Sequence, residues 1–120
     1  MFKYIRRQLF KRTLIIDTEK KILAHEIDIN IAEVRDIPKI KETVREAMRE
    51  VSKTAEALSK AKKELKGKSI KRFEVSAQQA QSYLEMMNKV QKEVEAKRFS
   101  LLKNLQTYES NLRIFKSFPW

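Results

Sequence analysis

The spacing of apolar residues between positions 37 and 65 predicts one long helix. Small or branched side chains recur at alternating steps of three and four, at positions 37, 40, 44, 47, 51, 54, 58, 61 and 65. This alternation places them along one side of a helix, where a second helix can pack. Asp36 suits the N-cap, and Pro38 fits the first turn, where its missing N–H would have no partner. We therefore predict a helix over residues 37–66.

A second stripe with the same spacing predicts a longer helix over residues 76–115. Eleven of its thirteen positions are apolar, and the full set is Phe73, Ala77, Ala80, Leu84, Met87, Gln91, Val94, Arg98, Leu101, Leu105, Tyr108, Leu112 and Phe115. Ser76 and Gln79 have the spacing of a capping box, which favours a helix start there. The two polar members, Gln91 and Arg98, either set the register of the packed helices or lean to solvent.

Gly67 is the only glycine in the chain, and it lies between the two predicted helices. Glycine is favoured just after a helix end because it adopts a left-handed conformation at little cost. A phosphate-binding loop would need further glycines and a preceding strand. We therefore predict a basic turn over residues 67–75. The tip that it forms is rich in lysine and arginine, namely Lys60, Lys62, Lys63, Lys66, Lys68, Lys71 and Arg72.

Residues 1–36 give an ambiguous pattern. The stretch "HEIDINI" (25–31) alternates polar and apolar residues as a half-buried strand does, yet Leu23, Ile27, Ile31 and Val34 also form a helical stripe. We favour a helix from about Thr18 to Arg35, and the alternative is a pair of strands over 13–17 and 22–29. The predicted fold is all-α, an elongated, coiled-coil-like antiparallel hairpin of helices. An N-terminal third helix or a short strand pair would complete it as a single domain, residues 1–120.

The first fourteen residues carry basic side chains and no acidic ones. The basic residues are Lys3, Arg6, Arg7, Lys11 and Arg12. As a helix, this segment would place Phe2, Ile5 and Leu9 on one stripe. Three interpretations are open: a docked helix with basic exposed sides, an arm that contacts anionic lipid or nucleic acid, or an organelle transit segment. The segment is short and lacks serine, which disfavours the third.

Composition narrows the fold and the chemistry. One glycine and two prolines in 120 residues supply too few turns for β-sandwiches, barrels or α/β folds. The absence of cysteine excludes disulfides, thiolate zinc sites and thiol nucleophiles. No apolar run approaches 18 residues, so we expect no transmembrane span.

Positive charge is distributed unevenly along the sequence. The net charge of +11 divides into +5 over residues 1–24, +1 over 25–67 and +5 over 68–120. The acidic residues alternate with basic ones at helical spacing, which is typical of solvated faces rather than of paired catalytic carboxylates. His25 is the only histidine, and we expect it to be packed or solvated. We therefore predict a protein that is not an enzyme and binds no cofactor or metal.

Aromatic residues gather at the C-terminal end of the sequence. Phe115, Phe118 and Trp120 lie in or beside the tail, residues 116–120, and Pro119 stops a helix there. Exposed aromatic side chains mark a contact when they gather in a patch. They either fold back on the chain's own helices or anchor in a neighbouring subunit.

These features favour a structural or assembly subunit that contacts other protein subunits, including a second copy of itself. Its basic ends would meet acidic partners. The alternatives are a nucleic-acid-binding coat or nucleoid-type protein that contacts phosphates without reading sequence, and a peripheral protein on an anionic membrane surface. We favour an intracellular location over secretion.

Two short stretches resemble known helical proteins. Residues 65–69 (LKGKS), followed by Phe73, resemble the turn of small secreted helical hairpins that carry a tryptophan–any–glycine motif, with leucine here in place of tryptophan. The stretch "YLEMMNKVQKEVEAKR" (83–98) is similar to coiled-coil stalk proteins of flagellar and type III export. Either resemblance implies a role in protein secretion without catalysis.

Overall fold

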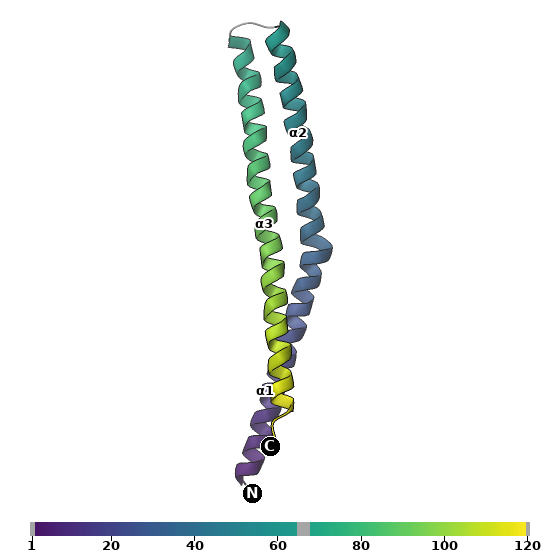
Figure 1. Cartoon of the computed structure of the whole chain (residues 1–120), viewed down its shortest axis with the longest axis vertical. Helices are drawn as coiled ribbons and strands as arrows, with labels where there is room; N and C mark the ends of the chain where they lie inside the picture. The colour runs from purple at the N-terminus through teal and green to yellow at the C-terminus, as the bar shows by residue number, and fades with distance from the viewer. Residues whose placement is uncertain (1, 65–67, 120) are drawn as a thin grey trace. The chain divides into compact units, whose positions relative to one another are not determined.

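The computed structural model describes residues 2–64 and 68–119, and these are helical almost throughout (Figure 1). The elements are helix α1 (Phe2–Ile31), the π-helical turn η1 (Ala32–Asp36), helix α2 (Ile37–Glu64) and helix α3 (Lys68–Lys116). No strand occurs within the described ranges. The all-α class and the helical hairpin are therefore confirmed.

The helices pack as two units. Unit 2 is Arg35–Glu95, and it contains the predicted hairpin of α2 with the first part of α3, side by side in Figure 1. Val44, Ala47, Ala61 and Ala80 are buried between these helices. Every described position of the two predicted stripes in this unit is buried or half-buried. The 3-4 spacing therefore identified the packed sides of both helices correctly.

Unit 1 pairs Met1–Val34 with Ala96–Trp120. Its contacts run antiparallel, because Glu33 pairs with Arg98, His25 packs on Tyr108 and Glu19 reaches Lys116. The stripe positions of α3 from Arg98 to Phe115 are all half-buried here. α3 thus contributes one continuous packing side, which α1 meets in unit 1 and α2 in unit 2.

The expected helix from about Thr18 to Arg35 is present, as part of a longer helical stretch, but a third helix or a strand pair that completes the hairpin before residue 37 is not supported. α1 passes through η1 into α2 without a non-helical residue, so residues 13–17 and 22–29 are helix. The alternation in "HEIDINI" arises because Ile29 faces inward and is buried, while Ile27 and Ile31 lie on another side of the same helix and are exposed. Two apolar faces on one helix imitate the two-residue period of a strand.

The π-helical turn η1 lies directly before Pro38 and joins α1 to α2 without a break in the helix. Proline has no N–H and removes one bond from a regular α-helix, and π-helical turns are common where the α-helical ladder is interrupted. The inward positions Ala32, Asp36, Ile40 and Val44 here are four residues apart, and an i→i+5 turn accommodates this longer spacing. Asp36 was the predicted N-cap of the helix, but its Oδ1 accepts a hydrogen bond of 2.9 Å from Nε of Arg35, and the chain is already helical before it.

α3 begins at Lys68, so the basic turn expected over residues 67–75 is wrong for residues 68–75. Ile70 and Phe73 are half-buried. Because these side chains pack, the helix begins eight residues before the predicted cap at Ser76. Gly67 and Leu65 lie outside the described residues. At its other end α3 stops at Lys116, where Ser117 turns back to bond the carbonyls of Arg113 and Ile114.

Among the helices that the structure describes, none contains a stretch long and apolar enough to cross a bilayer.

Candidate functional site

α1 has two apolar faces on nearly opposite sides. At about 100° per residue, the positions on each face fall within a sector roughly 80–100° wide. The inner face consists of Ile15, Thr18, Ile22, His25, Ile29 and Ala32. The outer face, which we call the outer stripe, consists of Phe2, Ile5, Leu9, Ile16, Leu23, Ile27, Ile31 and Val34. Only one of these faces can meet α3.

The inner face packs against α3 within unit 1. Thr18, Ile29 and Ala32 are buried, and the other members are half-buried. The Thr18 hydroxyl donates a hydrogen bond of 2.7 Å to the carbonyl of Leu14, which satisfies the one buried polar side chain of this face. The inner face is therefore occupied by the chain's own helix.

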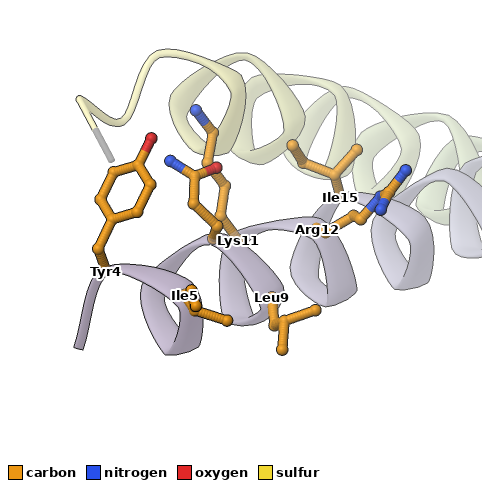
Figure 2. Close-up of a pocket in the computed structure, with 7 residues that line it drawn as sticks. Tyr4, Ile5, Leu9, Lys11, Arg12 and Ile15 are labelled. Carbon is orange, nitrogen blue, oxygen red and sulfur yellow. The ribbon is translucent and has the colours of Figure 1, made fainter. Parts of the chain in front are cut away.

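The outer stripe is exposed along its whole length. The exposed fraction is 84% for Phe2, 59% for Leu23 and 71% for Val34, and the other five members range from 36% to 57%. Figure 2 shows the N-terminal part: Lys11 and Ile15 point toward the C-terminal end of α3, while Ile5 and Leu9 point away from it. Nothing in unit 1 covers this stripe within the described residues.

Exposed apolar side chains are concentrated on this first part of the chain. Of the sixteen large apolar residues that are exposed among those the structure describes, ten lie between Phe2 and Val34. The rest, such as Phe99 and Ile114, are more widely spaced along the sequence, and scattered residues of this kind are normal for a protein surface. The members of the outer stripe instead lie along one side of one helical stretch, and exposed apolar patches mark interaction sites.

A hollow of about 370 Å³ lies at the N-terminal end of α1 (Figure 2). All seven residues that line it belong to α1, including Tyr4, Leu9 and Arg12. Side chains of a single helix cannot surround a ligand, so this hollow is a feature of the helix surface. A second hollow, lined by Ile40 and Thr43 of α2 with Met87 and Val94 of α3, lies between the helices of unit 2.

The basic N-terminal residues are distributed around α1. Lys3, Arg6, Arg7 and Arg12 are exposed, whereas Lys11 is half-buried. The Lys11 ammonium group donates a hydrogen bond of 2.9 Å to the carbonyl of Phe118. One member of this predicted site therefore holds the C-terminal tail, and the other four extend into solvent.

The predicted basic tip lies at the end of unit 2 where α2 stops and α3 starts (Figure 1). Its members with described side chains are all exposed, and they are Lys60, Lys62, Lys63, Lys71 and Arg72. Lys62 and Lys63 suit the negative C-terminal end of α2. Lys66 and Gly67 lie outside the described residues, as does the side chain of Lys68. The tip is a concentration of positive charge.

The aromatic tail packs against its own chain as far as Pro119. Phe115 and Phe118 are half-buried, and their rings meet edge to face at 5.7 Å. The tail is also held by the bond from Lys11 to the Phe118 carbonyl. Trp120, the third residue of the predicted anchor, lies outside the described residues. For the two phenylalanines, the geometry is that of a tail folded back on unit 1.

His25 is packed against Tyr108 of α3. Its ring meets the Tyr108 ring edge to face at 5.0 Å, and Nδ1 lies 2.9 Å from the Lys21 carbonyl. Because a carbonyl only accepts, Nδ1 carries the proton in this arrangement. The Lys21 ammonium lies 5.7 Å from the centre of the same Tyr108 ring. No group of three or more potential metal-ligating side chains occurs among the described residues.

The two polar residues of the α3 stripe behave differently. Arg98 reaches η1, directly after α1, and pairs with Glu33 at 2.7 Å between Nη2 and Oε1. Gln91 stays on its own helix and donates to Glu95 at 3.2 Å. Arg98 thus links the two segments of unit 1, whereas Gln91 makes a bond within one helix.

The outer stripe is the feature that the sequence analysis missed. Its two ends were visible as separate groups, Phe2 with Ile5 and Leu9, and Leu23 with Ile27, Ile31 and Val34. Ile16 lies on the same side of the helix, seven residues from Leu9 and seven from Leu23, which would have indicated that the two groups share one side. The sequence contains no signal, however, for which of two apolar faces meets α3.

Comparisons with protein-family models, with curated proteins and with solved structures find no match to this chain. No family match therefore supports the resemblance of residues 65–73 to secreted hairpins or of residues 83–98 to export stalk proteins.

Proposed function

We propose that this chain is a non-enzymatic assembly subunit that binds another protein helix through the outer stripe of α1. The observation that carries the proposal is the row of eight large apolar side chains left uncovered on a helix whose opposite face is already packed. Helix-in-groove and helix-on-helix contacts use this i, i+3, i+4, i+7 arrangement of anchors.

The stripe is large enough to drive a contact. Burying a Val, Leu, Ile or Phe side chain completely contributes about 1.5–3 kcal/mol, so burying the remaining half of eight such side chains contributes on the order of 6–12 kcal/mol. Association costs an estimated 4–15 kcal/mol, which is of similar size (~10 kcal/mol at mid-range). The stripe therefore supports a reversible contact, and the charges beside it decide which partner binds.

Site-specific photo-crosslinking tests this proposal. A photoreactive amino acid replaces Leu23 on the outer stripe or, as the matched control, Phe99, which is exposed on α3 in the same unit. In the cells that make the protein, we expect discrete protein adducts from position 23 and none of comparable yield from position 99. Equal labelling at both positions, or no protein adduct at position 23, would contradict the proposal.

Binding to nucleic acid is a second candidate function, and the exposed basic tip favours it. Lys60, Lys62 and Lys63 from α2, together with Lys71 and Arg72 from α3, lie at one end of unit 2. Such a cluster contacts phosphates without reading sequence. A peripheral membrane role is supported only by the first twelve residues, because acidic side chains flank the outer stripe beyond Ile16.

A further inference from the structure

The distribution of charge along α1 identifies the partner that its outer stripe fits. Residues 3–12 carry five basic side chains and no acidic one. Residues 24–33 carry three acidic side chains, Glu26, Asp28 and Glu33, and no Lys or Arg. Residues 13–23 between them carry two of each sign. The stripe passes along all three segments, and in the middle one Thr13 and Lys20 alternate with its apolar members Ile16 and Leu23.

We propose that the occupant of the outer stripe is the outer stripe of a second copy of this chain, packed antiparallel to the first. This inference rests on the proposed function and names its partner. When the two stripes overlap from end to end, Phe2 lies level with Val34 of the second copy, and Leu9 lies level with its Ile27. Large apolar residues then meet apolar residues near both ends of the contact, and toward its centre Ile16 lies level with Lys20 and Leu23 with Thr13.

The same register matches the charges. Residues 3–12 lie alongside residues 24–33 of the second copy. Lys3, Arg6 and Arg12 of one copy then lie near Glu26 and Asp28 of the other, whereas Lys11 and Glu33 are already bound to Phe118 and Arg98 of their own chain. The neutral segment 13–23 faces itself. A parallel arrangement would instead place Lys3, Arg6 and Arg12 of each copy beside those of the other, and like charges side by side are unfavourable. Charge therefore selects the antiparallel orientation.

Other occupants fit the stripe less well. An anionic membrane or a nucleic acid would be attracted to Arg6, Arg7 and Arg12 but repelled at Glu26 and Asp28, although the apolar row continues there. The length of the row also suits a helix. From Phe2 to Val34 it extends about 48 Å at ~1.5 Å per residue, the scale over which a helix pair buries a standard interface of ~800 Å² per partner.

Cysteine pairing tests the orientation directly, since the chain contains no cysteine of its own. The variants Leu9→Cys and Ile27→Cys are purified separately, then oxidised mildly, alone and mixed. We expect a disulfide-linked dimer from the mixture at a rate at least about tenfold above either variant alone, because only residues 9 and 27 lie close enough for a disulfide. Efficient linking of Leu9→Cys with itself would indicate parallel packing and overturn the proposal.

Sedimentation equilibrium of the full chain tests the dimer itself. We expect a monomer–dimer equilibrium at micromolar concentration, and Leu23→Glu with Ile27→Glu should weaken it by roughly 100-fold or more, because the carboxylates would enter an apolar contact. The control Phe99→Glu should leave it unchanged. Circular dichroism confirms that each variant is folded. A dimer that survives Leu23→Glu with Ile27→Glu would overturn the proposal.

The two proposals fail separately. A chain that stays monomeric at high micromolar concentration overturns the second copy as occupant. If position 23 then still crosslinks to a different protein, the assembly function stands with another partner. If position 23 labels only lipid or nucleic acid, both proposals are overturned.

Discussion

At the scale of single residues, the link between Arg98 and Glu33 is the best-defined polar contact across unit 1. Both guanidinium nitrogens Nε and Nη2 approach the same Glu33 oxygen, at 2.8 and 2.7 Å. The side chains are 41% and 43% exposed, so water weakens their attraction. Exposed pairs of this kind contribute little to stability, typically ~0.2–1 kcal/mol. The pair therefore contributes more to the alignment of α3 with the first part of the chain than to the free energy of unfolding.

A double-mutant cycle measures this contribution. We expect the coupling free energy between Arg98→Ala and Glu33→Ala to be about 0.5–1 kcal/mol and to fall as salt is added, because the charges are partly solvated. Urea unfolding followed by circular dichroism supplies the four free energies of unfolding. The matched control is Arg113→Ala, which removes only a bond of 3.4 Å to Ser110 on its own helix. A coupling above about 2 kcal/mol would show that the pair is effectively buried.

At the scale of elements, η1 and Pro38 distinguish the first half of the chain from the uninterrupted α3. Proline inside a helix removes a backbone bond, and the π-helical turn directly precedes it. The turn also fits the four-residue spacing of the inward positions from Ala32 to Val44. Two causes therefore act together, and substitution of Pro38 separates them.

Pro38→Ala restores the missing N–H donor. We expect it to raise the free energy of unfolding by about 1–3 kcal/mol, since proline is about 3 kcal/mol less favourable than alanine within a helix. Thermal unfolding by circular dichroism measures the change, and Pro119→Ala in the non-helical tail is the control. A loss of stability in Pro38→Ala would indicate that the longer turn itself is needed to align the inward side chains.

The helices themselves could largely be predicted from the sequence. Periodicity identified the packed sides of α2 and α3, because each of these helices has one main apolar stripe, as at Val44, Ala47 and Ala80. Periodicity could not identify the packed side of α1, because this helix has two apolar stripes. Ile29 packs inward and Ile27 outward, and no local signal distinguishes them. The candidate site is the apolar face of α1 that does not pack on α3. Which face packs depends on residues of α3 that lie more than sixty positions away in sequence.

At the scale of the whole molecule, positive charge occurs at two separate places. One is residues 3–12 of α1 in unit 1, and the other is the basic tip of unit 2. The tip has no acidic partner among the side chains described, since the ion pairs of the described residues lie elsewhere. This arrangement keeps the tip free to contact an anionic partner.

Salt dependence shows whether that partner is nucleic acid. If the second candidate function is correct, binding to duplex DNA or RNA should weaken steeply with salt, and Lys60→Glu, Lys62→Glu and Lys63→Glu together should abolish it. Fluorescence anisotropy with a labelled duplex measures both effects. The control is Lys39→Glu, Lys41→Glu and Lys53→Glu, which removes the same charge from α2 outside the tip. An absence of binding at low salt would eliminate this function.

The composition of unit 1 has a consequence for biosynthesis. Unit 2 is one contiguous stretch, Arg35–Glu95, so its helices can close as soon as that stretch has left the ribosome. Unit 1 joins Met1–Val34 to Ala96–Trp120, and its helix pair cannot form until residues 96–120 have been made. Until then both apolar faces of the nascent α1 remain uncovered. α1 is therefore made before α2 but covered after it, and it is the segment on which nascent-chain chaperones would be expected to act.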